Sequence, residues 1–298
     1  GRRADAQPAL ARHAAGADRM SVYPAVNFKE NRMRKGYRSI VTCLAAAAVC
    51  MTVAFPGSAA EVTMPSAGKA DPLVVDISQW NDDVKTDKDN INFSLLATQV
   101  KAVYIRSYGR SSSAPYTPYI DYQAVNFAKS AHAVNLKYGF YYYYIPTTDD
   151  SSTRSQAQMF YNFIKDYEYQ CIPALDVEEN PNGLSPDQLA ASVKVFTDTF
   201  RSVSGLDMMI YSYPYFIANN MSASSHWDQY MLWIAHYNVP APMSGISSWM
   251  PSSKWCWPRW DMWQYTSTGS LSSIPSSSGG HLDMNTATDN IYLTTPGH

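Results

Sequence analysis

The sequence lacks the motifs that mark several common classes of enzyme. Its six histidines form no HxxxH or HExxH spacing, and no CxxC pair is present, so it shows no metal-binding motif. A GxSxG motif and a glycine-rich phosphate loop are also absent, which leaves no sign of a serine hydrolase or of a nucleotide-binding enzyme. We expect no metal and no other cofactor.

Basic residues are scarce where we expect the folded domain. Residues 61–298 contain 14 Lys and Arg against 22 Asp and Glu, a net charge of −8 that the basic first part of the chain hides in the total of −2. A surface of this charge does not favour nucleic acid or an anionic membrane as a partner. We expect neither, and we expect the mature protein to be a monomer.

Residues 33–60 have the pattern of a secretory signal peptide. A positively charged start precedes an apolar run, and small residues end the segment at Ala60. The run is shorter than the ~20 residues that a transmembrane helix needs, and it ends in Pro56-Gly57. We therefore expect a secreted protein, extracellular or associated with a cell wall, that leaves the membrane once the signal peptide is removed.

The expected signal peptide divides the rest of the chain. Residues 1–32, rich in Ala and Arg, show no apolar periodicity, and we expect an upstream extension without fixed structure. We expect residues 61–72 to form a short linker and residues 73–298 to form one domain, which is long enough for a substantial core. Export would permit a disulfide between Cys171 and Cys256, but two distant cysteines do not establish one, so both states stay open.

Apolar, β-branched and aromatic runs recur along the domain and predict eight strands. The runs are residues 73–78, 102–108, 137–145, 172–178, 207–213, 231–237, 261–266 and 281–285. Segments of helical period follow the first four runs, at residues 91–100, 119–135, 151–167 and 185–203. The last of these has the clearest start, because Ser185 and Gln188 can form a capping box around Pro186.

Alternation of strands and helices predicts parallel strands joined by right-handed crossovers. Eight such strands suggest a closed barrel. After the fifth strand the connections become rich in Pro, Ser and Gly, so the last three strands are expected to lack full helices. The predicted fold class is α/β, as an incomplete, TIM-like β/α barrel.

Acidic residues occupy the ends of the predicted strands where β/α barrels carry their working residues. Asp76 ends the first strand, Asp176 and Glu178 end the fourth, and Asp283 lies on the eighth. Closure makes the eighth strand a neighbour of the first, so we expect Asp76 and Asp283 side by side, across the barrel mouth from the other pair. Crowded carboxylates of this kind have the separated pKa values that acid and base catalysis needs.

The pair Asp176 and Glu178 carries the strongest signal. An apolar run precedes the pair and Val177 separates it, which indicates a strand buried on both faces, where an unused carboxylate is costly. Two residues along a strand span ~6.5 Å, and Glu179 takes the opposite parity, so we expect it to face solvent. This spacing does not choose between retaining, inverting and substrate-assisted glycosidases.

Aromatic and polar side chains surround these acids and suit a sugar ligand. Sugar rings present apolar C–H faces that stack on aromatic rings, although core packing explains most aromatic residues of a barrel. His236 is expected to be an ordinary strand residue. The predicted substrate-binding residues are Tyr142, Tyr144, Tyr211, Trp233, Tyr237, Trp263, Gln264 and Arg106.

The ordered motifs of the domain resemble the glycoside hydrolase family 25 lysozymes. The resemblance covers about residues 73–293, and six motifs in one order are far more specific than any single one. They are DISQW (76–80), AVYIRSYGR (102–110), YIDYQAVNFAKSAHAVNLKYGFYYY (119–143), PALDVE (173–178), LWIAHY (232–237), and WQYTSTG (263–269) with DMN (283–285).

The resemblance implies a secreted N-acetylmuramidase that cuts the β-1,4 bond after N-acetylmuramic acid in peptidoglycan glycan strands. By motif position, Glu178 is then the general acid. Asp176 would orient a substrate N-acetyl group that acts as an internal nucleophile, while Asp76 and Asp283 position this group and tune the charge.

The chain departs from the family pattern in two places. Many members have a Lys followed by a Thr-Glu-Gly element where this chain has Arg106 and then SYGR, so a role for an acid there is in doubt. The loop between Gly269 and Asp283 is some four residues longer than usual. Two other functions stay open: a glycosidase acting on chitin or another N-acetylated glycan, although no DxxDxDxE run is present, and a non-catalytic barrel that binds cell walls.

Overall fold

The computed structural model describes residues 73–82, 90–221, 227–237, 257, 260–275 and 281–297. All of them belong to one of two compact units of the chain, Glu61–His298. The predicted extension (1–32), signal peptide (33–60) and linker (61–72) lie outside the described residues, as does Cys256. In the described part of the chain, no helix is long and apolar enough to cross a membrane.

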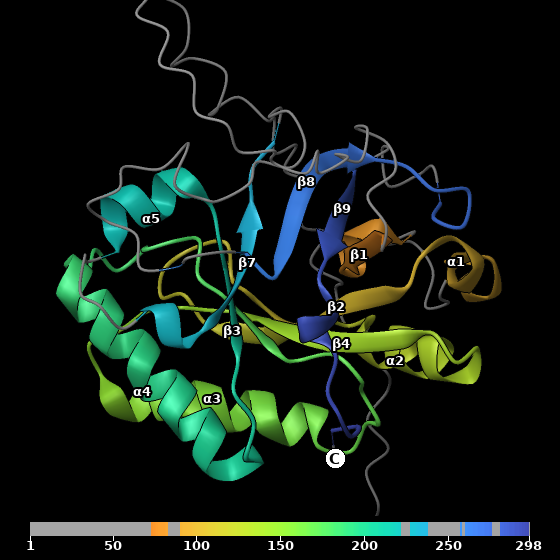
Figure 1. The fold of residues 1–298 in the computed structure, drawn as a ribbon. Coiled ribbons are helices and arrows are strands. Elements are labelled where there is room, and N and C mark those ends of the chain that lie inside the picture. The colour runs from red at the N-terminus through yellow and green to blue at the C-terminus, as the bar shows by residue number, and fades with distance from the viewer. Residues whose placement is uncertain are drawn as a thin grey trace, which may run out of the picture. The chain divides into compact units, whose positions relative to one another are not determined.

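Eight strands close a barrel, as the sequence predicts (Figure 1). They pair in the order β1, β9, β8, β7, β6, β5, β4 and β2, and β1 pairs with β2 to complete the ring. Each overlaps one of the eight predicted runs. The bounds are β1 (Leu73–Ile77), β2 (Ala102–Arg110), β4 (Lys137–Tyr143), β5 (Ala174–Asp176), β6 (Met209–Ser212), β7 (Met231–Ala235), β8 (Met262–Gly269) and β9 (Leu282–Ala287).

Helices accompany the first part of the barrel. They are α1 (Phe93–Gln99), α2 (Ala124–Ala133), α3 (Asp150–Ile164), α4 (Pro186–Ser204) and the short α5 (Pro214–Asn220). Helix α4 begins as predicted, with a capping box between Ser185 and Gln188. Among the described residues no α-helix follows β7, β8 or β9. The prediction that the last three strands lack full helices is confirmed.

Two details of the strands differ from the prediction. Strand β9 runs antiparallel to both β1 and β8, whereas strand-helix alternation predicts parallel strands throughout. A parallel strand would need a crossover, which usually contains a helix, and none occurs in the described part of this connection. A three-residue strand, β3 (Pro118–Ile120), also forms a hairpin with the end of β2, so the second helix starts five residues later than predicted.

Strand alternation sorts the aromatic residues into two cores. One core fills the barrel and includes Tyr104, Tyr211 and Trp233. The other lies between the strands and the helices and includes Phe160 of α3 and Phe196 of α4. Because successive residues of a strand face opposite ways, every second side chain of each strand points into the barrel, and the last of these reach its mouth.

Candidate active site

The four predicted acids lie in one cluster at the mouth of the barrel. Asp76 and Asp283 are direct partners in the antiparallel pairing of β1 with β9, as predicted. Asp176 ends β5, and Glu178 follows it. The negative charges act on one another across the barrel, since the charge of Asp76 raises the pKa values of Asp176, Glu178 and Asp283.

Side-chain amides from two neighbouring strands hold Asp76. Its Oδ1 accepts hydrogen bonds from Gln264 Nε2 at 3.0 Å and from Asn285 Nδ2 at 2.8 Å. The amides are themselves fixed: Tyr211 and Tyr237 donate to Gln264, and Trp233 Nε1 donates to Asn285 at 2.7 Å. Burial raises the pKa of Asp76 to about 6, and the two amide hydrogen bonds oppose the rise.

Asp176 is buried, but its carboxyl group is not fully hydrogen-bonded. Its side chain is 5% exposed, and its Oδ1 has no hydrogen-bond partner among the described residues. Burial, the charge of Glu178 and the charge of Asp76 hold its pKa well above the ordinary value, while the Arg106 guanidinium opposes them. A buried polar atom without a partner is rare in folded proteins and calls for an explanation, such as a ligand that completes its hydrogen bonds.

Glu178 has the pKa of a group that exchanges protons near neutrality. Burial raises the pKa of Glu178 to about 7, the charge of Glu179 adds to the rise, and a hydrogen bond with Tyr143 and the charge of Arg110 oppose it. Asp283 shows the same direction, since burial and the charges of Asp76 and Glu178 keep its pKa well above the ordinary range. The site therefore holds several carboxyls that are easily protonated at mild pH.

An ion pair flanks Glu178 on the side of β2. Arg110 donates to Glu179, and the guanidinium lies over the ring of Tyr116 at 4.8 Å and over that of Tyr143 at 5.8 Å. Glu179 was expected to face solvent; its side chain is 41% exposed, but it is engaged with Arg110. Arg110 belongs to the SYGR stretch, which differs from the family pattern. The ion pair with Glu179 is thus made by a residue of this divergent stretch.

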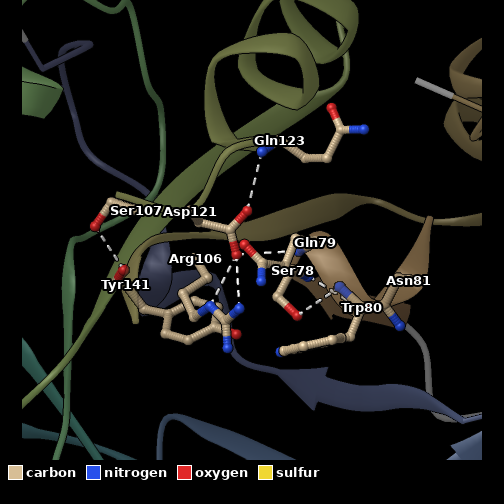
Figure 2. A network of polar contacts seen from close by, with 9 residues as sticks. All are labelled: Ser78, Gln79, Trp80, Asn81, Arg106, Ser107, Asp121, Gln123 and Tyr141. Carbon is tan, nitrogen blue, oxygen red and sulfur yellow. Dashed lines mark hydrogen bonds and ion pairs between the residues drawn. The ribbon is translucent and has the colours of Figure 1, made fainter. Parts of the chain in front are cut away.

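Five of the predicted substrate-binding residues belong to the same interior. Tyr211, Tyr237 and Gln264 form the network that holds Asp76. Trp233 lies deeper, at 1% exposure, with its ring 4.8 Å from that of Tyr211, so it supports the site from below. Arg106 reaches the interior from β2 and pairs with buried Asp121, its Nε 2.8 Å from Asp121 Oδ2 (Figure 2).

Three predicted sugar-binding residues face away from the acids, and their assignment is corrected. Tyr142 and Tyr144 belong to the outer core, where the Tyr142 ring lies 5.6 Å from that of Phe160 and the Tyr144 hydroxyl lies 2.6 Å from Ser192 Oγ. Trp263 also belongs to the outer core and donates to the backbone oxygen of His236 at 2.9 Å. All three have the strand parity opposite to that of the inward residues.

The list of predicted substrate-binding residues left out inward residues of the same strands. Tyr143 shares a hydrogen bond with Glu178, and the partly buried Tyr141 lies near Arg106 and Asp176. Both could have been found, because they are two residues apart on a strand whose partner in the barrel carries Asp176. Asn285 stands two residues after Asp283 and shares its parity. Within the described residues, no group of His, Cys, Asp and Glu is arranged to hold a metal ion.

Comparison with known proteins gives one family. A model of the family described as "Glycosyl hydrolases family 25" matches residues 75–274. An autolytic lysozyme of Clostridium acetobutylicum is 28% identical over 212 residues, which is 71% of this chain and 56% of that protein. Lysozyme M1 of Streptomyces globisporus is 29% identical over 122 residues, 37% of this chain and 35% of that protein. The chain thus spans about half or less of the length of these relatives.

Solved structures share the fold at low sequence identity. The spore cortex lytic enzyme SleM of Clostridium perfringens has a TM-score of 0.61 and 24% identity, over 74% of this chain and 69% of that one. A bacterial lysozyme of Streptomyces coelicolor has a TM-score of 0.56 and 22% identity, over 72% and 91%. A family 25 glycosyl hydrolase of Bacillus anthracis has a TM-score of 0.56 and 18% identity, over 78% and 96%.

Crowded acids should make the fold less stable as the pH rises. A carboxyl whose pKa is higher in the folded than in the unfolded protein binds more protons when folded, so the free energy of unfolding falls as the pH rises between the two values. For Glu178 this window runs from about 4, the unfolded value, to about 7. We predict that Glu178→Gln is more stable than the wild type at pH 8, by on the order of 2 kcal/mol, and gains little at pH 4.

Chemical denaturation at both pH values measures this difference. Glu168→Gln is the matched control, because Glu168 is an exposed residue outside the cluster and its substitution should change the stability little at either pH. An equal gain at pH 4 and pH 8, or a loss at pH 8, would contradict the prediction.

Proposed function

The chain belongs to glycosyl hydrolase family 25, and from this membership we propose that it is a secreted lysozyme. As an N-acetylmuramidase it would hydrolyse the β-1,4 bond between N-acetylmuramic acid and N-acetylglucosamine in peptidoglycan. The observation that carries the proposal is the cluster of four acids at the barrel mouth, with Asp76 and Asp176 buried and Glu178 beside them. The names of the curated relatives, both lysozymes, support peptidoglycan as the substrate. The signal-peptide pattern of residues 33–60 supports secretion.

Glu178 is proposed as the general acid. A carboxyl with a pKa of about 7 is protonated at mildly acidic pH and gives its proton to the oxygen of the scissile bond as that bond breaks. The hydrogen bond with Tyr143 orients the carboxyl and stabilises the carboxylate that remains. The same carboxylate then takes a proton from the water that completes hydrolysis.

Asp176 is proposed to act on the N-acetyl group of the substrate. Its unpartnered Oδ1 suits the amide N–H of that group. Held in this way, the acetamido oxygen bonds to the anomeric carbon as the leaving oxygen departs with the proton of Glu178, and the Asp176 carboxylate stabilises the positive charge that develops on the acetamido group. Asp76 and Asp283 would position this arrangement and set its charge.

The muramidase assignment is tested by the ends of the products. We expect protein from Glu61 onward to clear cell-wall suspensions and to release fragments with new muramic acid reducing ends, detected by mass spectrometry. We expect Glu178→Gln to lower kcat by at least 10² to 10⁴-fold while glycan binding persists, because general acid catalysis contributes about that much. New glucosamine reducing ends would indicate another N-acetyl glycosidase, and walls that are bound but left intact would indicate a non-catalytic binding barrel.

The stereochemistry of the first product tests the role of Asp176. Two successive displacements at the anomeric carbon, the first by the acetamido oxygen, predict retention of the β configuration, and Asp176→Asn should lower kcat strongly. Proton NMR of the first-formed anomer decides the matter. An initial α anomer would mean that water attacks directly, and the N-acetyl role of Asp176 would then be abandoned.

The ion pair beside Glu178 predicts how activity depends on pH. Since the acid must be protonated, kcat/KM should fall as the pH rises through about 7. Glu179→Gln removes a nearby negative charge and should move this limb to lower pH, whereas Arg110→Met removes a positive charge and should move it to higher pH. Asp198→Asn, in the exposed ion pair with Lys194 on α4, is the control and should leave the limb in place. If Glu179→Gln and Arg110→Met moved this limb of the pH profile in the same direction, the assignment of Glu178 as the acid would be contradicted.

A further inference from the structure

The turn after β1 presents an exposed tryptophan beside the acid cluster. Trp80 lies on the 3-10 turn η1 (Gln79–Asn81), four residues after Asp76, and it is 61% exposed. By contrast, the aromatic residues Trp233 and Tyr104 of the barrel interior are buried. A large apolar ring left in water at the rim of a site is a common sign of a binding surface.

Hydrogen bonds hold this turn in place from several sides (Figure 2). Ser78 and Asn81 close a capping box across the turn, and Asn81 Nδ2 donates to the backbone oxygen of His281 at 3.2 Å. The backbone N–H of Gln79 donates to Asp121 Oδ2 at 3.0 Å. The backbone that carries the ring is thus held in place before a ligand arrives, so binding loses little backbone conformational entropy.

Asp121 connects the tryptophan turn to the acids. It is fully buried, and the same Oδ2 that accepts from Gln79 accepts from Arg106 Nε at 2.8 Å. Arg106 in turn acts on the charge of Asp176. One carboxylate therefore holds both the turn that carries Trp80 and a cation of the site, which links the backbone beneath the exposed ring to the acid cluster.

We infer that Trp80 is a stacking platform for a sugar ring of the glycan chain, outside the two sugars that flank the cleaved bond. The proposal rests on the proposed function. An indole matches the apolar C–H face of a hexosamine ring, and a polymeric substrate supplies such rings beyond the bond that is cut.

Kinetics on substrates of two lengths distinguish a binding role of Trp80 from a general effect of its substitution on the active site. The substrates are long peptide-free glycan strands of peptidoglycan and the shortest oligosaccharide that the wild type cleaves. For Trp80→Ala we expect KM on the long strands to rise about tenfold with kcat unchanged, as when binding common to ground and transition state is lost. Both constants on the short substrate should stay within twofold of the wild type. Trp80→Phe, which keeps an aromatic face, should recover most of the loss.

Tyr215→Ala provides the matched control. Tyr215 is 72% exposed and follows β6, which is four strands from β1 in the ring, so its loss removes an exposed aromatic ring from the opposite side of the barrel. Equal losses on short and long substrates for Trp80→Ala, or a KM on long strands unchanged by it, would overturn the inference, as would the same length-dependent loss in Tyr215→Ala. If the wild type cleaves neither substrate, the proposed function fails instead.

Discussion

Asp76 accepts two amide hydrogen bonds inside the barrel, and the rest of the site is arranged around this carboxylate. The two amides come from β8 and β9, and their own partners come from β6 and β7, so five strands contribute to one network. Asp76 in turn pairs with Asp283 across the β1–β9 ladder and repels Glu178. Two side-chain hydrogen bonds favour the charge of Asp76, whereas no such hydrogen bond opposes the effect of burial on the raised pKa values of Asp176 and Asp283.

This cluster of carboxyls lowers the stability of the folded protein, but it provides the easily protonated groups that the proposed reaction needs. Burial disfavours every one of these charges, and mutual repulsion adds to the effect. The barrel tolerates the cluster because its two aromatic cores bury a large apolar surface on either side of the strands. Sites of this kind commonly lower the stability of the protein that carries them, because the features required for chemistry are not those that best fill a core.

The sequence predicted the eight strands, the closure of the barrel and the side-by-side placement of Asp76 and Asp283, because apolar runs and barrel closure depend on local pattern and simple topology. It failed on the direction of β9, which depends on how a connection folds back and not on the strand itself. It also misassigned Tyr142 and Tyr144, although the parity of Asp176 on the adjacent strand would have excluded them. The ion pair of Arg110 with Glu179 joins residues 69 positions apart, and no local pattern could have indicated it.

The antiparallel direction of β9 also affects how the length of the chain next to the site can vary among related sequences. A parallel strand begins at the far end of the barrel, so its preceding connection must cross the whole molecule. Here β8 and β9 form a hairpin, so Gly269 at the end of β8 pairs with Leu282 at the start of β9, next to Asp283. Residues can therefore be inserted or deleted in the connection between these two strands without changing the register of the ring. The chain next to Asp283 is therefore free to diverge in length while the acids keep their places.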